Sequence, residues 1–417
     1  MMRVTRVTTA VLEANYDWTL VRVETDEGVT GLGEAFFGPG LTGVIRDVAE
    51  LVIGSDPRDV EPLTRKMRLA TAHAGAAGGL VHHAITGIES ALWDLHARAL
   101  EVPLYRAFGG AFRTRIRVYA DCHAGDALES YSSVLQSRRP GWAPPDPMDG
   151  VVEEHWDPVE REGVYTTDAY AARARQMAGA GFTALKFDID LPRLPGEDLY
   201  ARTISHAQLE RQVELASAAC DAVPGVDVAF DCHWRYAAPD ALRLARALEA
   251  VPVFWLEDPL PPENVESLAG LCRATSTPVA TGENQYLVHG FEALLRAGAV
   301  DIVAPDFQKV GGLAEARRIA DRADSHYLPV APHNISGPVG TMASAHLCAV
   351  IPNFLALEWH AASVPFFEDL VVSGGPVIGE GHVQLGTAPG IGIELDLDVS
   401  RKYARRGELF FGEDLGA

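Results

Sequence analysis

The feature of this chain that most limits its possible folds is a regular alternation of short apolar runs with helical patterns from about residue 116 onward. Amphipathic stretches such as AEARRIADRADSH separate most of the runs. The eight runs are IRVYA at 116–120, ALKFD at 184–188, VDVAFD at 226–231, VFWLED at 253–258, PVATGE at 278–283, DIVAP at 301–305, LPVAP at 328–332 and FLALE at 354–358. Strands that alternate with helices in this way favour a closed parallel barrel. An open doubly wound sheet is the alternative, but the even spacing and the number of runs favour the barrel.

The first part of the chain has a different pattern. Residues 2–35 read as antiparallel strands, with alternating side chains and a turn at 26–28. Residues 41–108 are mainly helical in pattern, so the chain is predicted to begin with a small α+β domain that ends near residue 112. Residues 137–166 are rich in Pro, Gly and charge, and they predict either a surface loop or part of the rim of a site.

The charge and the cysteines exclude several classes of protein. A formal net charge of −22 argues against nucleic acids and anionic membranes as partners, because both need a basic surface. No apolar run is long enough to span a membrane, and the N-terminus lacks the apolar stretch of a signal peptide. The five cysteines stand singly, which favours a reduced compartment over a disulfide framework. We therefore expect a cytoplasmic protein that binds neither nucleic acid nor membranes.

Acidic residues end three consecutive runs. Asp231, Glu257 and Glu283 follow one another at intervals of 26 residues, one strand–helix unit each. Equivalent strand ends of a parallel barrel converge on one mouth, where three carboxylates repel one another unless a cation lies between them. Three oxygen ligands with room for water suit Mg²⁺. A single acidic residue more simply marks a strand end that faces water, and at this point both interpretations of the three stay open.

The next runs add a carboxylate and a histidine. Asp306 follows the sixth run, His333 follows the seventh 27 residues later, and Glu358 closes the eighth. A carboxylate beside a histidine fixes its tautomer and raises its basicity. A lone histidine in such a loop is more simply a capping residue, but the place of His333 in the series favours a catalytic pair.

Two more side chains lie at the same predicted mouth. Lys186, near the end of the second run, could neutralise a substrate carboxylate or could extend its ammonium group to solvent. His233 lies two residues beyond Asp231, on the same side if the strand continues. It is therefore either a second proton-transfer group or a loop histidine.

Together these motifs resemble the enolase superfamily, in its mandelate racemase-like branch, which contains many sugar acid dehydratases. The matching segments are VTGLGEA at 29–35, KFD at 186–188, DCH at 231–233, WLEDP at 255–259, TGE at 281–283, PD at 305–306, GG at 311–312, PHN at 332–334, Glu358 and PGIGIE at 389–394. They extend over nearly the whole chain, and their order and spacing make the set specific.

The resemblance implies an α/β fold with a modified (β/α)₇β barrel, a modified TIM barrel, over residues 116–360. It implies an α+β capping domain over residues 1–115, completed by a C-terminal segment, residues 361–417, that returns to the cap. It also implies a homo-oligomer.

The resemblance further assigns roles to the residues at the strand ends. The carboxylates of Asp231, Glu257 and Glu283 would bind Mg²⁺. His333 would be the base and Asp306 its partner. Glu358 would hydrogen-bond the substrate carboxylate or the enolate, and, by similarity to the galactonate and gluconate dehydratases, His233 would protonate the departing hydroxyl. Residues that would contact or select the substrate are Asp188, Arg235, Trp359, His360 and Trp18.

Two departures from the family pattern narrow the reaction. Many racemases of this branch carry Lys-x-Lys on the second strand, and Asp188 replaces the second Lys here. Relatives of the cycloisomerase type carry a Lys where this chain has Asp306. Both departures favour a dehydration with one base, in which a cation and Lys186 stabilise the enediolate and a sugar acid becomes a 2-keto-3-deoxy acid.

Two other functions stay open at this point. One is a racemase or epimerase of an α-hydroxy acid or an amino-acid derivative, which needs a second base on the opposite face of the intermediate. The other is a non-catalytic barrel retained for binding or assembly. The sequence does not determine which sugar acid is the substrate.

Overall fold

The computed structural model describes residues 2–124, 140–143, 163–193, 197–198 and 200–414. Most of the predicted insertion at 137–166 lies outside the described residues. The chain folds into two compact units. Unit 1 comprises Met1–Arg117, Glu283–Phe291 and Pro305–Ala417, and unit 2 comprises Val118–Gly282 and Glu292–Ala304. No helix in the described part of the chain combines the length and the apolar character needed to cross a membrane.

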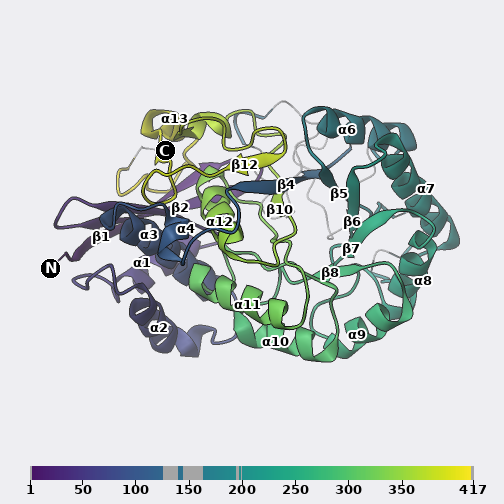
Figure 1. Ribbon diagram of the computed structural model, residues 1–417, viewed down its shortest axis with the longest axis horizontal. Helices are drawn as coiled ribbons and strands as arrows, with labels where there is room; N and C mark the ends of the chain where they lie inside the picture. The colour runs from purple at the N-terminus through teal and green to yellow at the C-terminus, as the bar shows by residue number, and fades with distance from the viewer. Residues whose placement is uncertain (1, 125–139, 144–162, 194–196, 199, 415–417) are drawn as a thin grey trace. The chain divides into compact units, whose positions relative to one another are not determined.

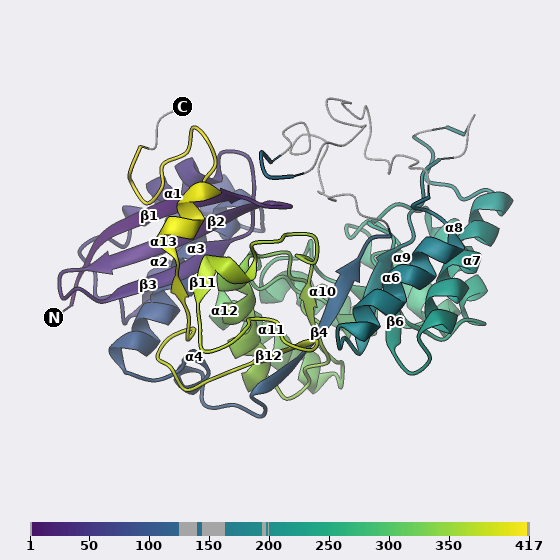
Figure 2. The same ribbon diagram turned by 90° about the horizontal axis from the view of Figure 1, so that it is seen from above.

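Unit 1 begins with an antiparallel sheet and the helices that pack on it (Figure 2). The strands are β1 (Val4–Glu13), β2 (Asp17–Thr25) and β3 (Thr30–Ala35), and the helices are α1 (Leu41–Ala49), α2 (Val60–Thr71), η1 (Ala72–Ala74), α3 (Leu80–Ala99) and α4 (Leu104–Ala107). Helix α3 approaches β3 closely because β3 carries glycines, and a Cβ atom on Gly31 would lie 2.1 Å from the Ala91 carbonyl oxygen. The predicted antiparallel strands and helices are therefore present in this part of the chain.

The C-terminal part of unit 1 returns to this sheet. Its elements are α11 (Leu313–Ser325), α12 (Pro338–Val350), β10 (Leu357–Trp359), η2 (Glu368–Leu370), β11 (Val371–Val372), β12 (His382–Gln384), β13 (Glu394–Leu395) and α13 (Leu397–Lys402). After α13 the Arg405 amide donates to the Val11 carbonyl and the Phe411 amide donates to the Thr9 carbonyl, each at 2.8 Å. These bonds attach the last residues to β1, as the resemblance implied.

Unit 2 is built on parallel strands. They pair in chain order as β4 (Arg115–Cys122), β5 (Ala184–Asp188), β6 (Asp227–Asp231), β7 (Val253–Glu257), β8 (Val279–Thr281) and β9 (Ile302–Val303). The helices that alternate with them along the chain are α6 (Thr167–Gly179), α7 (His206–Ala222), α8 (Ala238–Leu248), α9 (Val265–Ala274) and α10 (Leu287–Ala297), of which α10 begins in unit 1. Figure 1 shows α6 to α9 along the outside of the curved row of strands.

The register of these strands sets the positions of the acidic residues. Asp188 lies opposite Asp231, and Asp231 lies opposite Glu257. The strands are covered on both faces, so their apolar residues, such as Phe187 and Phe230, are fully buried. Three acidic residues therefore end neighbouring strands at the same level.

The prediction of a strand over residues 328–332 was wrong. Only Val330 pairs, in a single parallel bridge with Phe354. Pro329 and Pro332 flank it and have no N–H group to donate. The Leu328 amide donates to the Ala323 carbonyl instead, and Pro332 only accepts, from the Glu358 amide at 3.1 Å. The eighth predicted strand is displaced, since β10 begins at Leu357 instead of residue 354.

Candidate active site

In unit 2, Lys186 lies at the centre of a cluster of carboxylates. Its side chain is 1% exposed. Its Nζ atom lies 3.0 Å from Asp231 Oδ2, 3.0 Å from Glu257 Oε1 and 3.5 Å from Asp121 Oδ2. The Trp255 indole donates to the other Glu257 oxygen at 2.7 Å. The ammonium group therefore neutralises buried carboxylates and does not extend to solvent.

His233 follows β6 in a strained loop. Its φ angle is 44° and that of Trp234 is 58°, in the left-handed region that non-glycine residues rarely adopt. The backbone N–H group of His233 donates to Asp231 Oδ1 at 3.0 Å. Its ring Nδ1 lies 3.3 Å from Asp190 Oδ1, and Nε2 lies 3.8 Å from Asp188 Oδ1. Burial lowers the pKa of His233, but these carboxylates outweigh that effect and raise it well above its usual value.

The carboxylates around His233 are themselves perturbed. Burial raises the pKa of Asp231, but the positive charges of His233 and Lys186 outweigh this effect and bring the pKa well below its usual range. Burial raises the pKa of Asp188 well above its usual value. Asp188 Oδ2 also lies 3.0 Å from the Nδ1 atom of His123. The group thus surrounds a buried histidine with several acids, whose negative charges favour its protonated form.

Sequence reasoning missed two acids of this cluster, Asp190 and Asp121, as well as His123. Asp190 could have been found, because it lies two residues beyond Asp188 and side chains alternate along an extended segment. Asp121 gave a weaker signal, since nothing but its position at the end of the first run marked it. Both are buried, at 3% and 6% exposure.

In unit 1, His333 lies among three carboxylates. Its Nδ1 atom is 2.7 Å from Asp306 Oδ2, and its Nε2 atom is 3.4 Å from Glu283 Oε2 and 4.0 Å from Glu358 Oε2. Because a carboxylate only accepts, the bond to Asp306 places a proton on Nδ1, so Nε2 is the nitrogen that can exchange a proton with a substrate. Burial lowers the pKa of His333, but Glu283, Glu358 and Asp306 raise it to about 10.

Glu358 connects the histidine loop to β10. It is fully buried, and one carboxylate oxygen accepts from the Asn334 backbone N–H group at 3.0 Å. The Asn334 side chain donates in turn to the Glu358 carbonyl at 3.0 Å. These two bonds fix the loop that contains His333 to β10.

Two of the predicted substrate-binding residues, Trp18 and His360, are held by other groups of unit 1. Trp18, on β2, is 2% exposed, and its indole donates to the Ile335 carbonyl at 3.2 Å. The Nδ1 atom of His360 lies 3.1 Å from the Asn15 side-chain nitrogen, which also donates to the His360 carbonyl at 2.8 Å. Trp18 therefore packs as part of the first domain, a role the sequence did not indicate.

Two more of the five, Trp359 and Arg235, lie in different units. The ring of Trp359 packs edge-on against Phe367, with centroids 5.7 Å apart. Arg235, in unit 2, is 8% exposed, and burial lowers its pKa. The fifth predicted contact residue, Asp188, belongs to the cluster around His233, since its Oδ1 atom lies 3.8 Å from His233 Nε2.

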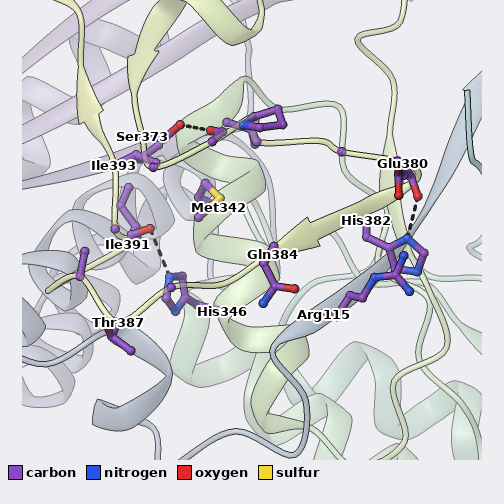
Figure 3. A pocket seen from close by; sticks show the side chains of 18 residues that line it. Arg115, Met342, His346, Ser373, Glu380, His382, Gln384, Thr387, Ile391 and Ile393 are labelled. Carbon is purple, nitrogen blue, oxygen red and sulfur yellow. Dashed lines mark hydrogen bonds between the residues drawn. The ribbon is translucent and has the colours of Figure 1, made fainter.

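A pocket of about 750 Å³ in unit 1 lies elsewhere (Figure 3). Helix α12 and the C-terminal segment form it, with Met342, His346 and His382 among its lining residues. His346 there bonds to the Ile391 carbonyl at 3.2 Å. None of the residues predicted for the active site lines this pocket, so we do not assign the chemistry to it.

Comparison with known families places the fold. Residues 4–109 match the N-terminal domain of the mandelate racemase / muconate lactonizing enzyme family, and residues 169–399 match the enolase C-terminal domain-like family. The chain therefore belongs to the mandelate racemase and muconate lactonizing enzyme group of the enolase superfamily, with an N-terminal cap and a C-terminal barrel. This confirms the predicted barrel and sets the doubly wound sheet aside.

Individual relatives define the enzyme class. The chain is 39% identical over 412 residues to a D-xylonate dehydratase of Haloferax volcanii, covering 99% of this chain and 91% of the relative. It is 29% identical over 404 residues to a D-galactonate dehydratase of Variovorax paradoxus, covering 95% and 92%. The crystal structure of a mandelate racemase/muconate lactonizing enzyme-like protein from Rubrobacter xylanophilus is 42% identical, with a TM-score of 0.88 over 98% of this chain and 99% of that one. This chain is accordingly an enzyme of the hydro-lyase class.

Proposed function

We propose that this enzyme dehydrates an aldonate, removing the α-proton and eliminating the β-hydroxyl to give a 2-keto-3-deoxy sugar acid. The observation that carries the proposal is the buried His333–Asp306 pair, bonded at 2.7 Å. The relatives named above act on xylonate and galactonate, which are both aldonates. The substrate is therefore a small sugar acid.

His333 is the base in this proposal. Asp306 holds the proton on Nδ1, so Nε2 is the atom that takes the α-proton. Glu358, one of whose carboxyl oxygens lies 4.0 Å from Nε2, is placed to hydrogen-bond the substrate carboxylate or the enediolate that forms when the proton leaves, a role in which its carboxyl group carries the proton that it donates. His333 thus acts at the α-carbon and Glu358 at the adjacent carboxylate.

The strand-end carboxylates fit a divalent cation. Asp231 and Glu257 are both 1% exposed and lie opposite one another in the β6–β7 register, and their combined charge exceeds that of Lys186, which bonds to both. Glu283 is 4% exposed and follows β8, the next strand. Buried carboxylate oxygens are ligands that Mg²⁺ prefers. We propose that these three residues hold one Mg²⁺, which when bound supplies positive charge where the substrate carboxylate gains negative charge.

Lys186 and His233 complete the proposed chemistry. The Lys186 ammonium group, 3.0 Å from two of the proposed metal ligands, stabilises the same developing charge. His233 protonates the departing hydroxyl, because hydroxide is a poor leaving group and needs an acid. The carboxylates of Asp188 and Asp190 face its ring.

The proposal predicts dehydration without racemisation. Asp188 replaces the lysine with which racemases remove a proton from the opposite face, and its carboxyl group lies beside the rings of His123 and His233. A library of acid sugars incubated with Mg²⁺ should give 2-keto acid from at least one aldonate. With a substrate that is turned over, NMR of the residual acid in D₂O should show no C2 epimer. Accumulation of that epimer at a rate comparable to turnover would favour a racemase or epimerase, and no 2-keto acid from any aldonate would overturn the proposal.

A further inference from the structure

The loops that carry His333 and Asp306 each lead into a helix that has no capping side chain of its own. His333 precedes Gly337, the N-cap of α12, by four residues, and Asp306 precedes Gly312, the N-cap of α11, by six. A glycine offers no side-chain oxygen to the N–H groups of the first turn. Both glycines are buried, so these N–H groups need acceptors from elsewhere in the protein.

Glu34, on β3, supplies the acceptors for α12. Its carboxylate is 1% exposed and accepts from the Gly337 amide at 2.7 Å and from the Gly340 amide at 2.8 Å. Residue 337 has to be glycine for this approach, because a Cβ atom there would lie 2.8 Å from the Trp18 ring. The Trp18 indole also donates to the Ile335 carbonyl, so the first domain holds the chain from 335 to 340 at three points.

Glu89, on α3, has the same role for α11. It is fully buried, and its two oxygens accept from the Leu313 amide at 2.7 Å and the Ala314 amide at 3.0 Å. A Cβ atom on Gly312 would lie 2.6 Å from its carboxyl carbon. The Thr86 hydroxyl, one turn earlier on α3, accepts from the Gly311 amide at 3.0 Å.

These carboxylates are buried with backbone amides as their main partners. Glu34 accepts from the two amides of α12, and Glu89 adds the indole of Trp93 at 2.8 Å to its two amides. Burial raises the pKa of each to about 7, and the amide bonds oppose that rise. The partial positive charge of a helix N-terminus favours a carboxylate at this position. A buried acid with such specific partners fixes the position of the helix that it caps.

We propose that Glu34 and Glu89 are positioning residues for the catalytic pair, which hold the His333 loop and the Asp306 loop at the distance where Nδ1 meets the carboxylate. The proposal rests on the proposed function for the reaction that it affects. All of these residues belong to unit 1, so the first domain and the catalytic pair form one compact body. The N-terminal domain thus contributes to proton abstraction through two carboxylates that need not touch the substrate.

Asp94 provides a matched control. It lies on the same helix as Glu89, is fully buried, and likewise accepts from two backbone amides, those of Leu32 at 2.8 Å and Ile391 at 2.7 Å. Neither partner belongs to the loops that carry His333 and Asp306. Asp94→Asn should therefore disturb the fold to a similar degree without moving the catalytic pair.

The test compares Glu34→Gln, Glu89→Gln and Asp94→Asn in the full chain. Glutamine has one acceptor oxygen, and its NH₂ group cannot accept from the second amide, so one N–H group of each helix loses its partner. Hydrogen exchange should rise over residues 333–340 in the first variant, over 306–314 in the second, and around Ile391 in the third. The imidazole ¹⁵N signals of His333, assigned with His333→Asn, should shift in both glutamate variants and stay in place in Asp94→Asn.

Kinetics provide the second readout. On an aldonate that the wild type dehydrates, kcat should fall by about 10- to 100-fold in each glutamate variant, with KM changed by less than about threefold, because the loss is one of alignment. Asp94→Asn should retain kcat within about twofold. If a glutamine variant fails to fold, Glu34→Asp or Glu89→Asp replaces it. Aspartate keeps both acceptor oxygens but is shorter by one methylene group, so the His333 signals should still shift.

Unchanged His333 signals together with wild-type kcat in the glutamate variants would overturn the proposal, and so would an equal loss of kcat in Asp94→Asn. The signals and the kinetics also separate this inference from the proposed function. If the wild type dehydrates no acid sugar but the His333 signals move as expected, the positioning role stands and the proposed substrate is wrong.

Discussion

Replacing Lys186 by methionine tests the charge balance of the unit 2 cluster. The ammonium group lies 3.0 Å from one oxygen each of Asp231 and Glu257, with all three side chains about 1% exposed. At an effective dielectric constant near 20, each such contact is an attraction of about 5–6 kcal/mol. Desolvation of the ions cancels much of it. Methionine fills a similar volume but leaves two buried carboxylates facing each other, so the metal-free protein should lose about 3–5 kcal/mol of unfolding free energy.

The assay is urea unfolding in EDTA, and Lys309→Met is the control. Lys309 is a second buried lysine, 3% exposed, whose Nζ donates to the neutral Asn284 side chain at 3.1 Å and lies 4.0 Å from the centre of the Phe36 ring. Among the described residues no carboxylate is bonded to Lys309, so the expected loss on its removal is only about 1 kcal/mol.

Saturating Mg²⁺ should restore much of the stability of the Lys186→Met variant and should stabilise it more than the wild type. The reason is that a cation between Asp231 and Glu257 replaces the missing ammonium charge, and a ligand that binds only the folded state stabilises it. A loss below about 1 kcal/mol in Lys186→Met, or equal losses in the two lysine variants, would refute the reasoning.

Further predictions concern single steps and conditions. His333→Asn should abolish exchange of the substrate α-proton with D₂O, and undiminished exchange would remove it from the mechanism. His233→Asn should lose dehydration while it retains that exchange; normal dehydration would mean that another acid protonates the hydroxyl. Activity should disappear after dialysis against EDTA and return with Mg²⁺, and full activity without added metal would contradict the metal assignment. Burial raises the pKa of Glu89 from its ordinary 4.5 to about 7, so the folded protein retains a proton that the unfolded chain releases. The stability from this proton is fully present below about pH 4.5 and is lost as the pH rises through 7, at up to about 1.4 kcal/mol per pH unit. Glu89→Gln should remove that part of the slope in urea titrations between pH 5 and 7, and an unchanged slope would show that Glu89 is not the group.

The parts of the fold that the sequence could predict are those set by local pattern. The limits of β5 were predicted to the residue, at 184 and 188, because the apolar run ends where the chain turns polar. The pairing of Asp231 with Glu257 could also be inferred, because residues one strand–helix repeat apart occupy equivalent positions on neighbouring parallel strands. Such features depend only on periodicity and on the repeat of one strand and one helix.

Features that depend on distant partners could not be predicted in this way. The strand at 328–332 was expected from its apolar residues, but Pro329 and Pro332 remove the donors that a ladder needs. Glu34 meets amides about 300 residues away along the chain, and Glu89 meets amides more than 220 residues away. In the sequence, Glu34 is an acid of the matching segment VTGLGEA and Glu89 an acid in a helix pattern, and neither shows what it bonds to. The binding partner of a buried acid is decided by the tertiary fold, which the local pattern does not contain.

Unit 1 is built from segments at both ends of the chain, and this affects the exchange of gene segments between related enzymes. This unit unites Met1–Arg117 with Pro305–Ala417, so the helices that follow the catalytic pair and the acids that cap them are encoded at opposite ends of the gene. A single crossover at the junction after the first domain combines Glu34 and Glu89 of one parent with helix N-termini of the other. Recombinants that take both ends from the same parent, and exchange only Val118–Gly282, keep these contacts intact. Segments of related enzymes are therefore exchanged with less disturbance of the catalytic pair as an internal segment than as a terminal domain.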